Sequence, residues 1–423
     1  MASSPRSIFS NDSSENIESP ATPETQAFFD LNQHNGNQPE DRYVLVTGGL
    51  GFIGSHTSIE LLKSGYNIVI IDNLSNSYQS VLDRLIQISH LVYGGRLDDC
   101  PKVHFHHFDY QNSLALREVL DVYSLPTKHG QALRSQITGV IHFAAFKSVS
   151  DSIKYPLEYY RNNINGLVDF LSVLHDYNIK KFVFSSSATV YGTIADRGIP
   201  VREEDCVHEP EIYHDQTGTA SVASQGCTGL TNPYGRTKFF GEAILSDLAN
   251  SDETWRIAAL RYFNPVGCDK SGLLGEEPKG IPSNLVPAVT RVLIGDIPSL
   301  SVFGDDWQTP DGTAIRDFIH VTDLAQAHIK SLAFLQSMTT TRNFRTYNIG
   351  TGQGHSVKQV VRAMEEVSQK LIPIITSGRR PGDVGICVAR TDRVSKELGW
   401  TAKMTLKEAC TDICTFLRAR DYF

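Results

Sequence analysis

The hydrophobic residues between Tyr43 and Asp72 fall into two short apolar runs separated by an amphipathic stretch. The runs are Tyr43–Val46 and Asn67–Ile71, and the stretch between them has a helical pattern that ends at Gly65. Short apolar runs without polar alternation are typical of strands that are buried on both faces of a parallel sheet. This part of the chain therefore predicts a strand, a helix and a second, parallel strand.

The same alternation of apolar runs and helical stretches continues to about residue 265. Strands that alternate with helices predict an α/β fold, a Rossmann-type doubly wound parallel sheet with helices on both faces. Ligands of such sheets bind beyond the C-terminal ends of the strands, and the polar clusters of this half follow those ends. The further predicted strands are Val103–Phe108, Val140–Phe143, Phe182–Phe184 and Ile257–Leu260.

The loop after the first strand carries glycines at Gly48, Gly51 and Gly54. A pyrophosphate binds at a helix N-terminus, and glycines allow the tight turn, the close approach and the helix–strand contact that this requires. Asp72 ends the next strand, where its carboxylate can accept both ribose hydroxyls of an adenosine. A 2′-phosphate would meet like charge there, and neither of the next two residues is a cation. The loop therefore predicts NAD rather than NADP.

Charge and cysteine usage narrow the function classes. The formal net charge of −8 and the pI near 6.0 argue against nucleic acid or an anionic membrane as a partner. No uninterrupted apolar stretch approaches the length of a bilayer span. Seven cysteines are scattered along the chain without a CxxC pair, which predicts reduced thiols in the cytosol and no disulfide framework.

Three histidines lie close together at His104, His106 and His107. On a strand the first two share a face and the third points away, and no further ligand follows at a useful spacing. We therefore expect packed or solvated histidines here and no metal.

The chain divides into three predicted parts. Residues 1–41 are rich in Ser, Asn, Pro and Glu without an apolar period, so we expect a disordered tail. This tail lacks the features of a signal or transit peptide. Residues 42–265 form mainly the dinucleotide-binding domain. Residues 266–423, with short strands and loops rich in Pro, Gly and Arg, predict a smaller mixed lobe that binds the substrate.

A second cluster of polar residues carries the candidate chemistry. Tyr234 and Lys238 are four residues apart and share one face of a predicted helix. To act as a base near neutrality a phenol must lower its pKa by about three units, roughly 4 kcal/mol. An adjacent ammonium and a cationic nicotinamide ring can jointly supply this. Ser185–Ser187 follow a predicted strand, where a hydroxyl can hold the reacting oxygen. Together with the dinucleotide loop, this predicts hydride transfer.

These motifs resemble the extended short-chain dehydrogenase/reductases, and among them the UDP-glucose 4-epimerase family. The resemblance runs from about Tyr43 to the C-terminus and rests on many motifs in the same order. They are Thr47–Gly54, Asp72–Ser77, His142–Lys147, Tyr159–Asn163, Ser185–Gly192, Asn232–Lys238, Arg261–Gly267, Gly280–Leu285 and Gly312–His320.

The resemblance implies a role for each catalytic residue. Tyr234 would take the proton of the sugar 4-hydroxyl while the C4 hydride passes to NAD. Lys238 would lower the pKa of the tyrosine and contact the nicotinamide ribose, and Ser187 would hydrogen-bond the sugar oxygen. The 4-keto sugar would turn over in the pocket and receive the hydride on its other face.

The resemblance also implies binding residues and partners, namely NAD, UDP-sugar substrates and a second copy of the chain in a cytosolic homodimer. NAD would be contacted by Gly48, Gly51, Phe52, Ile53, Gly54, Asp72, Asn73, Leu74, Ser75, Asn76, Ser77, Asp109, Tyr110, Phe143, Ala144, Ala145, Phe146, Lys147, Asn162, Ser187, Tyr234, Lys238 and Phe263. The UDP-sugar would be contacted by Ser187, Tyr234, Asn264, Asn284, Leu285, Ser301, Val302, Phe303, Arg316, Arg379, Asp383 and Cys387.

Two other functions are compatible with the same fold. Nucleotide-sugar dehydratases and decarboxylases of this superfamily carry an acid just after the strand's serine or threonine, whereas Ser187 is followed by Ala188. A non-catalytic NAD-binding regulator typically lacks the tyrosine or the lysine, and both are present. A reductase also remains an alternative.

The sequence departs from the family pattern in three respects. Regions of about 91–136 and 209–228 are longer than the family core needs and are expected to be surface insertions. Arg236 and Thr237 replace the Lys-Ser that is common between the catalytic tyrosine and lysine. Cys387 stands where members of narrow specificity carry a tyrosine, which predicts room for an N-acetyl group and activity on UDP-GlcNAc and UDP-GalNAc.

Overall fold

A seven-stranded, all-parallel sheet forms the centre of the computed structural model, which describes residues 41–127, 133–214, 218–280, 282, 284–337 and 343–422. The strand order is β14-β10-β7-β6-β1-β2-β3. All six predicted strands are in this sheet, and the predicted fold class is confirmed. The strands are β1 (Tyr43–Thr47), β2 (Asn67–Asp72), β3 (Val103–His107), β6 (Ile137–His142), β7 (Lys181–Ser187), β10 (Arg256–Tyr262) and β14 (Phe344–Ile349).

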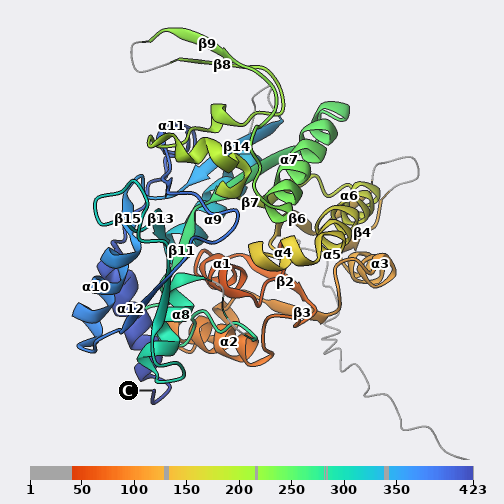
Figure 1. Cartoon of the computed structure of the whole chain (residues 1–423). Coiled ribbons are helices and arrows are strands. Elements are labelled where there is room, and N and C mark those ends of the chain that lie inside the picture. The colour runs from red at the N-terminus through yellow and green to blue at the C-terminus, as the bar shows by residue number, and fades with distance from the viewer. Residues whose placement is uncertain are drawn as a thin grey trace, which may run out of the picture. The chain divides into compact units, whose positions relative to one another are not determined.

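Alternate residues of each strand pack into two separate apolar cores, one on each face of the sheet. Val44 and Val46 of β1 face a core that includes α1, α2 and α9, and Tyr43 and Leu45 face a core that includes α3, α6 and α7 (Figure 1). The sequence is apolar throughout these strands because both faces are covered. The helices are α1 (Phe52–Lys63), α2 (Ser80–Val92), α3 (Ser113–Val122), α4 (Val149–Lys154), α5 (Pro156–Tyr160), α6 (Gly166–Asp176), α7 (Pro233–Ser251), α8 (Leu285–Leu293), α9 (Val321–Ser337), α10 (Val357–Ser368), α11 (Asp392–Leu398) and α12 (Leu406–Arg418). Single turns and irregular helices are η1 (Leu97–Asp99), η2 (Arg161–Asn165), η3 (Ala188–Arg197) and η4 (Glu203–Asp205).

The C-terminal part builds a smaller, mixed lobe around a third apolar core, formed by α8, α10, α12 and short strands. Its strands are parallel in the β12–β16 and β11–β13 pairs and antiparallel in β13–β15. β14 and α9 lie beyond residue 265 yet belong to the central sheet and its helix layer. The domain boundary at 265 therefore stays a prediction. The small strands are β11 (Asn264–Val266), β12 (Leu300–Phe303), β13 (Ile315–His320), β15 (Gly354–Ser356), β16 (Ile374–Ser377) and β17 (Ile386–Cys387).

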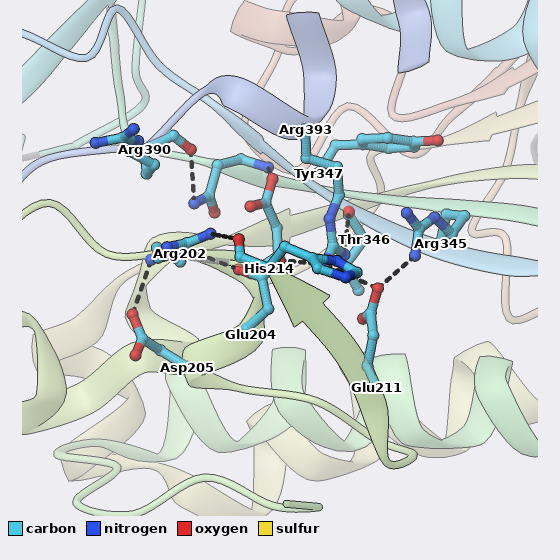
Figure 2. A network of polar contacts seen from close by, with 12 residues as sticks. Arg202, Glu204, Asp205, Glu211, His214, Arg345, Thr346, Tyr347, Arg390 and Arg393 are labelled. Atoms are coloured by element: carbon cyan, nitrogen blue, oxygen red, sulfur yellow. Dashed lines mark hydrogen bonds and ion pairs between the residues drawn. The ribbon is translucent and has the colours of Figure 1, made fainter. Parts of the chain in front are cut away.

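The two regions expected to be insertions have different structures. The first contains β3 and α3 of the main fold together with a short antiparallel pair, β4 (Ser124–Leu125) and β5 (Arg134–Ser135). The second forms an antiparallel hairpin of β8 (Glu211–His214) and β9 (Ala220–Ala223), which extends away from the helices around it (Figure 1). Arg345 of β14 and Arg393 of α11 hold its first strand through Glu211, at 2.7 and 3.0 Å (Figure 2).

The predicted tail of residues 1–41 lies outside the described residues except for Asp41. Within the described parts of the chain, none of the helices combines the length and apolar character needed to span a bilayer.

Candidate active site

A cavity of about 200 Å³ opens beyond the C-terminal ends of β1, β2, β6 and β7. It joins the glycine loop to the Tyr234 and Lys238 side chains, which lie far away in the sequence. Of the predicted dinucleotide contacts, those that line it are Gly48, Gly51, Phe52, Ile53, Gly54, Asp72, Asn73, Ser75, Asn76, Ser77, Tyr110, Phe143, Ala144, Ala145, Phe146, Lys147, Asn162, Tyr234 and Lys238. Leu74, Asp109, Ser187 and Phe263 are not among its lining residues.

The glycine loop is packed too tightly for side chains. Gly48 has a φ of +68°, and a Cβ there would lie 2.9 Å from the Ala144 backbone nitrogen. A Cβ at Gly54 would lie 2.1 Å from the Gly48 carbonyl oxygen. Gly51 is the N-cap of α1 and supplies no side-chain cap, and the first residues of the helix, Phe52–Gly54, line the cavity. An anion such as a pyrophosphate fits this helix N-terminus.

Asp72 ties the loop to the second strand. Its Oδ2 accepts from the Leu50 N–H at 3.0 Å, and its Oδ1 accepts from the Leu74 N–H and the Ser77 hydroxyl, both at 2.9 Å. An ionised carboxylate offers about four acceptor positions. The protein takes three of them, so the binding of both ribose hydroxyls by Asp72 stays a prediction.

Tyr234 lies at the start of α7, which is fixed by its first residues. Asn232 caps the helix by accepting the Gly235 N–H at 2.8 Å, and Pro233 is its first residue, where proline is favoured. The Tyr234 hydroxyl lies near Ser187 at the end of β7, whose hydroxyl accepts from the Thr189 N–H at 3.2 Å and from the Thr189 hydroxyl at 3.0 Å. Burial raises the pKa of Tyr234 to about 12, Ser187 lowers it, and Tyr159 raises it. The predicted pairing of the phenol with the Ser187 hydroxyl stays a prediction.

Lys238 is one turn further along α7 and is buried, with 3% of its surface exposed. Its Nζ donates to the Ser185 carbonyl oxygen at 2.6 Å and to the Ser185 hydroxyl at 3.2 Å, and lies 5.9 Å from the ring centre of Tyr234. Burial lowers its pKa to about 7, although the charge of Glu242 raises it. The surroundings of Tyr234 raise rather than lower its pKa, so its lowering by Lys238 and a nicotinium ring stays a prediction.

A buried ion pair lies behind these residues and was missed by the sequence reasoning. Arg261 of β10 and Glu242 of α7 are fully buried and contact each other at 2.7 Å. Glu242 also accepts from the hydroxyl of Ser186, the residue before Ser187, and from His208. A charged residue inside the apolar β10 run was the signal, because a buried charge requires a partner.

The chain was compared with known proteins. The model of the NAD dependent epimerase/dehydratase family matches residues 44–350. The UDP-glucose 4-epimerase of Dictyostelium discoideum is 43% identical over 375 residues, covering 89% of this chain and 95% of that protein. The human UDP-glucose 4-epimerase is 42% identical, covering 88% and 94%. The chain belongs to the NAD dependent epimerase/dehydratase family. The family resemblance and the cofactor predicted from the sequence are thereby confirmed.

A solved member of this family has the same fold. The UDP-glucose 4-epimerase of Bifidobacterium longum, in complex with NAD⁺ and UDP, aligns with a TM-score of 0.74 at 38% identity. The alignment covers 90% of this chain and 99% of that one.

The predicted substrate residues of this family member lie mainly on the small strands of the C-terminal lobe. Arg316 of β13 donates to Asp383 at 2.8 Å, and Arg379 donates to Asp306 at 2.7 Å and stacks on Trp307. Asn284 is the N-cap residue of α8, which begins at Leu285, and its side chain makes no capping hydrogen bond. The remaining ones are Asn264 on β11, Ser301, Val302 and Phe303 on β12, and Cys387 on β17. None of these lines the cavity of about 200 Å³, so their contacts with substrate stay predictions.

Several residues of the cavity wall were not predicted. Ser185, Ser186 and Tyr262 line the cavity together with Ile71 and Phe108. The serine run was recognised as a whole, but its spacing did not show that Ser185 would hold the lysine.

Of the three histidines that were considered as metal ligands, His104 is packed, as expected, and shares a hydrogen bond of 2.5 Å with the Tyr123 hydroxyl.

Proposed function

We propose that this chain is an NAD-dependent UDP-glucose 4-epimerase, which interconverts UDP-glucose and UDP-galactose through a transient 4-keto sugar. The observation that carries the proposal is the cavity that joins the glycine loop to Tyr234 and Lys238. The identity of 42–43% to curated UDP-glucose 4-epimerases over most of the chain supports the substrate.

Residues in and beside the cavity have separate roles in the reaction. Ser187, near Tyr234, holds the sugar 4-oxygen by a hydrogen bond, and Tyr234 accepts the 4-hydroxyl proton as a general base. Lys238, fixed by Ser185, places its amino group next to the reacting centre. NAD bound in this cavity would supply reversible hydride acceptance. Return of the proton from Tyr234 to the opposite epimer closes the cycle.

The substrate range includes the N-acetyl sugars UDP-GlcNAc and UDP-GalNAc. Cys387 packs in a small apolar core with Ala188, Val190, Tyr191 and Phe263, beside the turn that follows Ser187. A cysteine occupies less volume than the tyrosine of narrow-specificity relatives. A UDP-Glc/GlcNAc 4-epimerase from Campylobacter jejuni, 27% identical with a TM-score of 0.66, shares the fold.

The enzyme acts in the cytosol as a homodimer. Seven cysteines without a disulfide among them suit a reducing compartment. The homodimer follows from the family resemblance alone.

The reaction of purified protein with UDP-galactose tests this function. We expect UDP-glucose to form without net reduction of NAD, measured by chromatography and absorbance at the NADH band. A dehydratase would leave a keto sugar, a reductase would consume NADH, and a regulator would give no product. Tyr234→Phe should lower turnover by about 10²-fold or more. Tyr93→Phe, which removes a hydroxyl bonded to the Leu62 carbonyl oxygen away from the cavity, is the matched control. Full turnover by Tyr234→Phe would contradict the mechanism.

A further inference from the structure

Two cysteines lie opposite each other where the β8–β9 hairpin joins the body of the protein. Val207 and Gly226 pair as an antiparallel bridge, and the Gly226 N–H donates to the Val207 carbonyl oxygen at 2.8 Å. Cys206 and Cys227 are therefore the next opposite pair. In a regular antiparallel ladder such a pair has Cα atoms about 4.5 Å apart, within the range that a disulfide spans. Here the bridge is isolated, and Cys227 packs against the buried cluster that contains Cys206. The two thiols are also close enough to shift each other's pKa in opposite directions.

Cys227 connects two segments of the chain that lead to the candidate catalytic residues Ser187 and Tyr234. The Cys227 thiol donates to the Val190 carbonyl oxygen at 2.7 Å, in the turn that follows Ser187. Cys227 also begins the segment that runs to Tyr234, and the Gly229 carbonyl oxygen of that segment accepts the Thr193 N–H at 3.0 Å. A change at the Cys227 thiol would therefore lie next to the turn that follows Ser187 and to the segment that leads to Tyr234.

The hairpin base is anchored on the side of Cys206. Glu204 and Glu211, on either side of the cysteine, both contact Arg393, at 2.9 and 3.0 Å (Figure 2). The Cys206 carbonyl oxygen accepts from the buried Arg261 at 2.7 Å. Because these contacts hold Cys206 in place, a bond between the two sulfur atoms would fix Cys227 and the segment that it begins.

We propose that Cys206 and Cys227 are a redox modification site, which low-molecular-weight disulfides convert reversibly into a disulfide that lowers turnover. The Cys227 thiolate attacks the small disulfide, whose S–S bond breaks and releases one thiolate. Cys206 then loses its proton and attacks the Cys227 sulfur, and the second small thiol leaves. Two protein thiols are oxidised and one small disulfide is reduced to two thiols.

The surroundings of the two thiols favour this order of attack. Cys227 is half-buried, whereas Cys206 is fully buried. The neighbouring Cys206 thiol lowers the pKa of Cys227, and the Cys227 thiol together with burial raises the pKa of Cys206. The more accessible thiol is therefore also the better thiolate. In the disulfide the thiol proton of Cys227 is gone, and with it the hydrogen bond to Val190.

A metal ion is a less suitable ligand for the residues around Cys206 than a disulfide partner is for its thiol. Cys206, His208 and Glu242 have ligand atoms within 4.8 Å of one another. However, Glu242 already neutralises Arg261 and accepts from Ser186 and His208. A cation at this point would face the Arg261 guanidinium, and it would leave that buried charge without its carboxylate.

Peptide mapping of the full chain after treatment with oxidised glutathione tests the proposal. We expect a peptide pair linked through Cys206 and Cys227, released by dithiothreitol. Cys206→Ala should accumulate a glutathione mixed disulfide on Cys227, and Cys227→Ser should form neither product. Cys100→Ser is the matched control, because Cys100 is also half-buried and bonds the Arg96 carbonyl oxygen at 3.5 Å. Its cross-link should equal that of the wild type. Wild-type protein that keeps all seven thiols, or links another pair, would overturn the site.

The effect on catalysis is measured with UDP-galactose and rests on the proposed function, whereas the mapping does not. We expect oxidation to lower turnover by about twofold or more, because small displacements of catalytic residues slow reactions strongly. Dithiothreitol should restore it, and Cys227→Ser should not respond to the oxidant. A complete cross-link with unchanged turnover would overturn the coupling to the active site. Absence of turnover in the reduced protein would instead contradict the epimerase function.

Discussion

Lys238 donates its 2.6 Å hydrogen bond to the Ser185 carbonyl oxygen at the end of β7, and its ammonium is held by this strand rather than by the phenol of Tyr234. The tyrosine and the lysine share a helix face, as their spacing predicts, but Lys238 bonds Ser185, whereas Ser187 is the serine that lowers the pKa of Tyr234. The strand end thus positions both groups independently. Substitutions on the helix and on the strand should therefore have separable effects.

Lys238→Met should change how stability depends on pH. Burial lowers the pKa of Lys238 to about 7, below its unfolded value. Between about pH 7 and pH 10 the unfolded chain binds this proton and the folded chain does not, so the lysine makes stability rise with pH. From pH 7 to pH 9 the wild type should gain about 2 kcal/mol relative to Lys238→Met. Urea denaturation at both pH values measures this difference.

Lys330→Met is the control for that experiment, because Lys330 is exposed on α9. Its unfolding free energy should follow the wild type at both pH values. Equal pH dependence of the wild type and Lys238→Met would show that the buried lysine keeps an ordinary pKa in the folded protein.

Glu242→Gln should be among the most destabilising single substitutions of the charged residues. It leaves the fully buried Arg261 without its carboxylate, which costs about 3–5 kcal/mol. Glu366→Gln breaks the exposed pair with Lys407 at 2.6 Å and should cost less than about 1 kcal/mol. Urea denaturation at neutral pH compares the two, and equal losses would contradict the prediction.

The stabilisation by Glu242 should also depend on pH. Burial raises the pKa of Glu242, but the charge of Arg261 outweighs this and lowers the pKa to about 2. Because the folded value is below the unfolded one, the stabilisation is complete above about pH 4 and is lost as the pH falls toward 2. The difference between the wild type and Glu242→Gln should therefore narrow in acid.

Two glycines of the dinucleotide loop should respond differently to alanine. At Gly54 a Cβ would overlap the Gly48 carbonyl oxygen at 2.1 Å, so Gly54→Ala should cost at least about 2 kcal/mol. At Gly51, with a φ of −68°, a Cβ would meet its nearest atom at 3.4 Å, so the fold should lose less than about 1 kcal/mol. Gly51→Ala should nevertheless retain little NAD, because the methyl group stands at the N-terminus of α1. Thermal unfolding and release of NAD on denaturation measure both effects, and full NAD retention by Gly51→Ala would contradict the assigned phosphate site.

The sequence predicted six strands of the central sheet and missed the seventh, β14. β14 contains Arg345, Thr346 and Asn348, which interrupt the apolar run. These polar groups are paired only in three dimensions: Arg345 contacts Glu397 and Glu211, and the Asn348 N–H donates to Glu203 at 2.8 Å. No local pattern identifies such partners.

The candidate site was predicted to a similar extent and for similar reasons. Glycine spacing and the Tyr234–Lys238 spacing are local, and both gave residues that line one cavity. The contact of Lys238 with Ser185 and that of Glu242 with Arg261 join separate elements, so they follow from the packing of α7 on the sheet. The raised pKa of Tyr234 could not be predicted from the local sequence either, because burial in the folded protein is its largest cause.

Cys387→Tyr should restrict the enzyme to the sugars without an N-acetyl group. Cys387 is buried, with 8% of its surface exposed, and packs with Phe263 beside the turn after Ser187. Its strand β17 pairs with β13 next to Arg316, a predicted UDP contact. A phenol ring at this position would fill the space that the N-acetyl group requires. We expect kcat/KM for UDP-GalNAc to fall at least about tenfold, while kcat/KM for UDP-galactose stays within about threefold. Cys387→Ser keeps the small volume and should leave both values near those of the wild type. Absence of wild-type activity on UDP-GalNAc, or equal losses on both substrates in Cys387→Tyr, would show that Cys387 does not set the sugar specificity.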